Sequence, residues 1–153
     1  MASGTTGGMG IKVEVKDIDR GMERAIGAVS DMDGSHVLVG VLEGSRTGQF
    51  VQTDEPETLI AEYAAELEYG TGNQKREWAW MRGVLDAKRA AYQKMMGNLY
   101  SDVLRGKMTV EQMFNVIGLQ MQADFKINIT DLQLIDTGAM RNSIAILVKV
   151  KKQ

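Results

Sequence analysis

The chain of 153 residues contains no cysteine, one histidine, one proline and only 6% aromatic residues. Without cysteine it can form no disulfide, thiolate zinc site or iron–sulfur cluster, and it has no thiol nucleophile. The single histidine, His36, excludes a multi-histidine metal site and a histidine proton relay. We therefore expect no catalytic, metal-binding or cofactor-binding residue, no cofactor and no enzymatic activity.

Long apolar runs are also missing. None approaches the roughly 20 residues that a membrane-spanning helix requires, so we expect no membrane partner. The first ten residues, MASGTTGGMG, lack the basic start and apolar centre of a secretion signal. Their four glycines predict a flexible arm over residues 1–10. The remaining length, with 44% hydrophobic and 25% charged residues overall, predicts one folded domain over residues 11–153.

The charges are unevenly divided along the chain. Residues 1–70 carry 5 basic and 13 acidic side chains, a net charge of -8, whereas residues 71–153 carry 13 basic and 7 acidic ones, a net charge of +6. Opposite halves can pair within one chain or between copies, and a chance split over a solvated surface is a third interpretation. The total of -2 disfavours nucleic-acid binding through bulk charge.

Hydrophobic periodicity predicts strands at residues 11–15, 36–42 and 144–150, of which the second is apolar enough for a central strand. The aperiodic segment 43–53 is typical of a loop. Helical spacing predicts a helix over 18–29 and one that begins with the capping pair Asp54 and Glu57 and ends at Gly70 or Gly72. Two more are expected: a long helix over 77–105 that Gly97 can break, and one that follows a Thr109–Gln112 capping box. The fold class is therefore α+β, a small, mainly antiparallel sheet packed against three to four helices, one of them long.

Two local motifs have competing interpretations. The string Asp136-Thr137-Gly138 is similar to the active-site loop of dimeric aspartic proteases. Only 15 residues follow Gly138, however, so we favour a turn in which the glycine supplies a positive φ. The carboxylates of Glu62, Glu66 and Glu68 indicate a solvated or ion-paired helix face rather than a metal site.

An aromatic–basic cluster precedes the long helix. Its members are Arg76, Trp78, Trp80 and Arg82. Such clusters bind single-stranded nucleic acid, and they are equally typical of protein interfaces. We favour the interface, and keep a small nucleic-acid-binding regulator as an alternative function.

Three separated segments resemble the HK97-type neck and tail-completion family of tailed bacteriophages. They are VLVGV at 37–41, IAEYAAELEYGT at 60–71 and LIDTGAMRNSI at 134–144, which contains the turn Asp136, Thr137 and Gly138. The resemblance implies a structural virion protein that forms a homo-oligomeric ring of six or twelve copies in the neck. DNA would pass through this ring without sequence recognition, between portal-proximal adaptor and tail-top proteins. A tail terminator or head-closure protein is the alternative within the same class. The implied location is the virion, and the host cytoplasm during assembly.

The charge division predicts how such copies would meet. A closed ring needs two different, complementary patches on each chain. We expect the acidic helix 54–68 of one copy near the basic segment 75–94 of the next, with aromatic burial providing affinity. The candidate inter-subunit residues are Glu62, Glu66, Trp78, Trp80, Arg82 and Lys88. We expect acidic or neutral groups from the first 70 residues toward the DNA channel.

Overall fold

A computed structural model of the chain describes residues 21–41, 60–71, 76–134 and 138–151. Within these ranges the chain forms five helices and two strands, which confirms the predicted α+β class. In chain order they are α1 (Met22–Met32), β1 (His36–Val41), α2 (Ile60–Tyr69), α3 (Arg82–Leu104), α4 (Val110–Asp131), α5 (Ala139–Ser143) and β2 (Ile144–Lys149).

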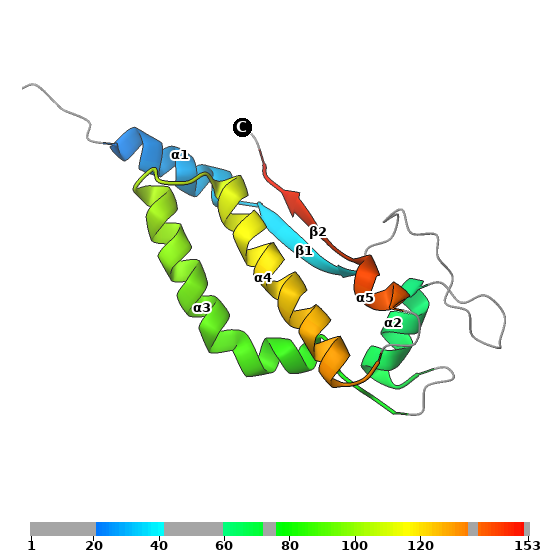
Figure 1. Cartoon of the computed structure of the whole chain (residues 1–153). Coiled ribbons are helices and arrows are strands. Elements are labelled where there is room, and N and C mark those ends of the chain that lie inside the picture. The colour runs from blue at the N-terminus through cyan, green and yellow to red at the C-terminus, as the bar shows by residue number, and fades with distance from the viewer. Residues whose placement is uncertain (1–20, 42–59, 72–75, 135–137, 152–153) are drawn as a thin grey trace, which may run out of the picture.

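The long helices α3 and α4 form an antiparallel hairpin, and the two strands lie along the other side of α4 (Figure 1). Helix α1 lies beside the turn that joins α3 to α4, whereas α2 and α5 pack together at the opposite end. Helix α4 is thus the central element, in contact with α3 and with both strands.

The strands form an antiparallel ribbon in which Val37 faces Val148 and Leu38 faces Leu147. Because side chains alternate along a strand, the face toward α4 consists of β-branched residues. This face is Val37, Val39, Val41, Ile144, Ile146 and Val148. The helix comes close because residue 118 is a glycine: an added Cβ there would lie 3.0 Å from Val37 and 3.2 Å from Ile146.

The expectation that the strand starting at His36 is covered on both faces is wrong. Leu38 and its partner Leu147 are exposed on the face that points away from α4. Among the described residues β1 pairs with β2 alone. Its apolar run therefore reflects one half-buried face toward α4 and an outer face on which Leu38 is exposed.

The long helix exists, but it starts five residues later than predicted. Residues 77–81 form an irregular lead-in in which Ala79 has φ of 46°. From Arg82 the helix continues for 23 residues, about 35 Å. Gly97 does not break it, and a Cβ added there would meet no atom within 4 Å, so this glycine faces open space.

Other helix boundaries agree with the predicted signals. Thr109 and Gln112 form the expected capping box at the start of α4, with both reciprocal hydrogen bonds present. Gly70, with φ of 66°, follows the last residue of α2 and donates its N–H to the Glu66 carbonyl. By contrast, helix α1 differs from the predicted range of 18–29, since it begins at Met22, after Gly21 with φ of 109°, and ends at Met32. It contains no buried residue, although its sequence is amphipathic.

The buried side chains form two groups. The larger one joins α2, the lead-in to α3, α3, α4, α5 and β2; its members are Ile60, Ala64, Leu67, Trp80, Val84, Tyr92, Phe125, Ile129, Met140 and Ile144. The smaller one, beside the α3–α4 turn, consists of Val103, Val110, Met113 and Ile117. The predicted strand 11–15, arm 1–10, loop 43–53 and capping pair Asp54 and Glu57 lie outside the described residues.

Candidate interaction surfaces

Trp80, predicted at a contact between copies, is a core residue. Its side chain is 2% exposed, its Nε1–H donates to the carbonyl of Ala64 at 2.9 Å, and its ring meets Phe125 edge-to-face at 6.0 Å. An indole enclosed in this way cannot reach another copy. The prediction that Trp80 contacts another copy is therefore wrong. The sequence did not exclude it, because an aromatic residue at the start of an amphipathic helix can lie either on the surface or in the core.

Glu68 ties the end of α2 to the start of α3. One carboxylate oxygen accepts the backbone N–H of Met81 at 2.8 Å, and the other accepts the backbone N–H of Arg82 at 3.1 Å and its Nε–H at 2.8 Å. The guanidinium also donates to Glu77 at 2.6 Å. The hydrogen bond that Arg82 donates to Glu68 raises the pKa of Arg82. The carboxylate therefore caps α3 from a distant part of the chain.

A second buried carboxylate, Asp124, joins the two long helices. It accepts hydrogen bonds from Lys88 Nζ at 2.6 Å, the Tyr92 hydroxyl at 2.7 Å and Gln120 Nε2 at 3.2 Å. Burial alone would raise the pKa of Asp124, but these hydrogen bonds and the charge of Lys88 outweigh it and lower the pKa. Burial and the bond to Asp124 raise the pKa of Tyr92 above its ordinary range.

This network predicts a loss of stability in acid. A carboxyl group whose pKa is lower in the folded than in the unfolded state stabilises the folded state at any pH above the unfolded-state pKa of about 4. This stabilisation disappears as the pH falls through the folded-state pKa of the group. We expect Asp124→Asn to lower the free energy of unfolding near pH 7, and the difference from wild type to shrink by about pH 2. Urea unfolding followed by circular dichroism across this range measures it. Asp131→Asn, at an exposed position of the same helix, is the control, and a pH-independent Asp124→Asn difference would contradict the assignment.

The remaining predicted contact residues are accessible to different degrees. Arg82 and Lys88 are exposed, yet each is held by a buried carboxylate of its own chain. Glu62 is exposed and Glu66 half-buried, and no ion pair among the described residues involves either. The Glu68–Arg82 pair joins the acidic and basic halves within one chain, which favours the intramolecular interpretation for that pair. An inter-subunit role for the other residues stays a prediction.

The other motifs have local structural roles where the structure describes them. Arg76 stacks on the half-buried Trp78 ring at 4.0 Å, so this cation–π contact is made within the chain. Gly138 has φ of 74° and precedes α5, as the turn interpretation requires. Asp136 and Thr137 lie outside the described residues. His36 is exposed, and its Nδ1 lies 3.3 Å from the Gly34 carbonyl.

The exposed apolar residues of the described elements include three groups that were not predicted from the sequence. Helix α4 presents Val116, Leu119 and Ile127, which are 41%, 54% and 57% exposed. Helix α1 presents Met22, Ile26 and Val29, and the outer face of the ribbon presents the Leu38–Leu147 pair. Large apolar side chains grouped on a surface mark interaction sites. The periodic spacing of such residues predicts a helix but not which face is covered.

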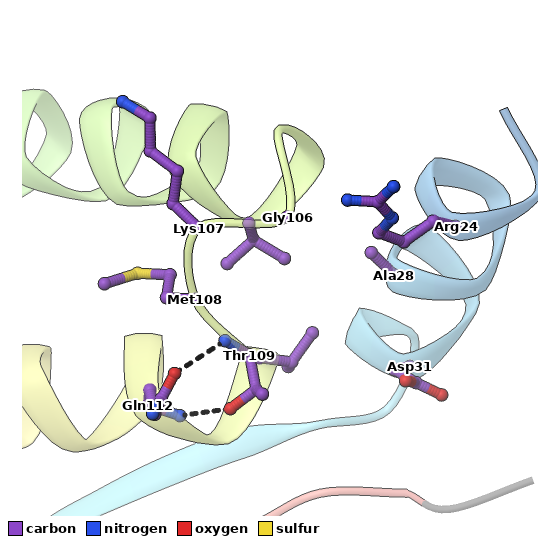
Figure 2. Close-up of a pocket in the computed structure, with 10 residues that line it drawn as sticks. Arg24, Ala28, Asp31, Gly106, Lys107, Met108, Thr109 and Gln112 are labelled. Atoms are coloured by element: carbon purple, nitrogen blue, oxygen red, sulfur yellow. Dashed lines mark hydrogen bonds between the residues drawn. The ribbon is translucent and has the colours of Figure 1, made fainter. Parts of the chain in front are cut away.

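A polar hollow lies near the α3–α4 turn. It is a cavity of about 360 Å³ that Arg24, Asp31 and Lys107 line (Figure 2). The polar groups of Thr109 and Gln112 at its edge are used by the capping box. Over the described ranges, no group of three or more His, Cys, Asp or Glu side chains could hold a metal ion. None of the helices described is long and apolar enough to cross a bilayer.

Comparison of the chain with protein-family models, curated proteins and solved structures finds no match.

Proposed function

We propose that this chain is a structural virion protein of a tailed bacteriophage, which assembles as a homo-oligomeric ring in the neck through which DNA passes. The observation that carries the proposal is the set of exposed apolar residues on three separate elements: α1, α4 and the outer face of the ribbon. A ring subunit must meet a neighbour on each side through different patches, and a neck protein also meets the rings above and below. Three surfaces suit such a subunit better than they suit a monomer.

The ion-pair network supports the same proposal. Glu68 and Asp124 are buried and hydrogen-bonded, so they hold α2, α3 and α4 together rather than serving chemistry. The long hairpin is thus a fixed support for its surface residues. The resemblance of segments 37–41, 60–71 and 134–144 to the neck and tail-completion family gives the proposal its biological setting.

The test is the assembly state of the purified full-length chain. Sedimentation velocity should detect a discrete oligomer whose population grows with protein concentration, and negative-stain electron microscopy should show closed rings of six or twelve copies around an open channel. A chain that remains monomeric at all concentrations would overturn the proposal. A gel-shift assay at physiological salt should show no sequence-specific DNA retention; salt-resistant specific binding would favour the regulator instead.

A further inference from the structure

We infer that copies of the chain are joined by strand exchange: residues 11–16 of one copy pair with the outer edge of β2 in the next copy as a third strand. We call these residues, IKVEVK, the donor segment. The inference rests on the proposed ring and names the contact that links its subunits. The described part of the chain begins at Gly21, so the sequence of the donor segment and its reach along the chain carry the inference.

The outer edge of β2 is open in the part of the chain that the structure describes. Strand β2 packs against β1 and α4, whereas β1 is also in contact with α2 and α5 (Figure 1). The carbonyl of Ile144 points outward, where it accepts the Nε2–H of Gln122 at 2.6 Å. Because alternate residues of a strand direct their backbone groups to the same side, the N–H and C=O groups of Ile146 and Val148 also point outward. No hydrogen bond between described residues reaches these groups, and an open edge of this kind is a template for a further strand.

The donor segment has the pattern that this edge requires. Its apolar residues are all β-branched and alternate with charged ones. They are Ile11, Val13 and Val15, among Lys12, Glu14 and Lys16. When the segment is added to β2, the β-branched side chains continue the layer of Ile146 and Val148 toward α4, and the charged ones stay on the accessible face. Segment 43–53, which also lies outside the described residues, has no such alternation.

The donor segment is too close to α1 along the chain to lie along the whole of β2 in its own copy. Helix α1 and β1 follow one another in nearly one direction, so α1 begins at its end far from the ribbon (Figure 1). The end of β2 lies beside the α1–β1 turn, where the Lys151 N–H donates to the Ser35 hydroxyl at 3.0 Å.

The way back from the start of α1 is therefore long. It covers the 11 residues of α1, about 16 Å, and the width of both strands, about 10 Å, which is a direct diagonal of about 19 Å. Residues 17–20 span at most about 18 Å when fully extended, which leaves nothing for the reversal of direction. The donor segment of a neighbouring copy is under no such constraint.

Strand exchange gives each copy two different contact sites, the donor segment before α1 and the acceptor edge on β2. Each copy then donates to one neighbour and accepts from the other, which is the head-to-tail arrangement that closes a ring. The main-chain hydrogen bonds provide affinity, and the alternation of side chains fixes which face of the donor segment is buried.

Because the chain has no cysteine, disulfide cross-linking tests the contact directly. Three donor chains carry Lys12→Cys, Glu14→Cys or Lys16→Cys, on the face that stays accessible. Each is dissociated, mixed with a size-tagged full-length chain that carries Leu147→Cys, reassembled and oxidised. At least one of the three should give a covalent dimer that contains one tagged and one untagged chain. Val13→Cys, which belongs to the opposite face of the donor segment, should give none.

The matched control replaces Leu147→Cys by Leu38→Cys. The two leucines face each other across the ribbon and are 42% and 41% exposed, so they differ in position but not in accessibility. Leu38 lies one strand farther from the outer edge of β2, about 10 Å from an added strand, which is beyond the reach of a disulfide. Cross-links to Leu38→Cys but not to Leu147→Cys would place the donor segment at the edge of β1 and overturn the inference.

The other outcomes overturn the inference in distinguishable ways. Rings that form without any mixed dimer would place the contact elsewhere and leave the proposed function standing. A double variant, Glu14→Cys with Leu147→Cys, that closes a disulfide within the monomer while the mixed dimer is missing would show pairing in the same copy. Dimers from Leu147→Cys alone would indicate a two-fold contact between ribbons. Absence of any assembly would remove both the ring and this contact.

A second measurement does not depend on oxidation. Val13→Pro removes a backbone N–H from the donor segment and should raise the dissociation constant of assembly at least about tenfold. Thr5→Pro, the same substitution outside the donor segment, is the control and should leave assembly unchanged. Urea unfolding of the variant monomer checks its folding. Unchanged assembly of folded Val13→Pro, or a loss of monomer stability without weaker assembly, would contradict the exchange.

Discussion

Trp80→Ala should destabilise the folded chain by about 3–5 kcal/mol, the cost of removing a large aromatic side chain from a packed core. The indole is almost fully enclosed, meets the Phe125 ring edge-to-face and donates a hydrogen bond to α2. Because a domain of this size has only about 5–15 kcal/mol of total stability, the variant should unfold at a much lower urea concentration. Urea titration followed by circular dichroism measures the change.

Two variants separate the contributions at this position. Trp80→Phe retains an aromatic ring but loses the N–H that bonds to the Ala64 carbonyl, so we expect about half the loss. Trp78→Ala, two residues away, removes a half-buried ring whose contact with Arg76 contributes about 0.5–1 kcal/mol, and it should be much milder. Equal effects of Trp78→Ala and Trp80→Ala would contradict the core position of Trp80.

The contrast between these tryptophans illustrates what the sequence could predict. Each stands before α3 in the same aromatic–basic cluster, and composition alone gives them the same role. The distinction arises in the lead-in, where Ala79 takes a positive φ and the chain changes direction. A local pattern does not contain this bend, because distant residues such as Phe125 of α4 and Ala64 of α2 fix the position of the indole.

Structural features that depend only on residues close together in the sequence were predicted correctly. The Thr109–Gln112 capping box, Gly70 after α2 and the positive φ of Gly138 each follow from chemistry within a few positions of the chain. The register of the ribbon and the partners of Glu68 and Asp124 depend on contacts between segments far apart. For that reason the sequence groups Glu68 with Glu62 and Glu66 on a solvated or ion-paired helix face, although of the three only Glu68 is buried.

Contacts between distant segments also explain why the uneven division of charge along the chain did not by itself locate an interface. A net charge of +6 on the second half says nothing about which cations already have partners. Arg82 and Lys88 both contact buried carboxylates of their own chain, so reversing their charge would test folding before it tested assembly. The exposed apolar residues of α4 form no ion pair, so substituting them does not raise this difficulty.

Glu68→Ala should cost about 2–3 kcal/mol of stability, because it removes a cap and leaves backbone donors at the start of α3 without their acceptor. Glu68 is buried and accepts the N–H groups of both Met81 and Arg82. Glu68→Gln keeps one carbonyl oxygen for these donors but loses the negative charge, so we expect a smaller loss, on the order of 1 kcal/mol.

The matched control is Glu62→Ala, six residues earlier in the same helix but exposed, which should change stability by less than about 0.5 kcal/mol. Urea unfolding of the three variants at neutral pH gives the ranking. Hydrogen exchange of the Met81 and Arg82 amides gives a local readout, since both should exchange faster in Glu68→Ala and at the wild-type rate in Glu62→Ala. If Glu62→Ala costs as much as Glu68→Ala, the cap is not the source of the stability, and the carboxylates of α2 act through their shared charge instead.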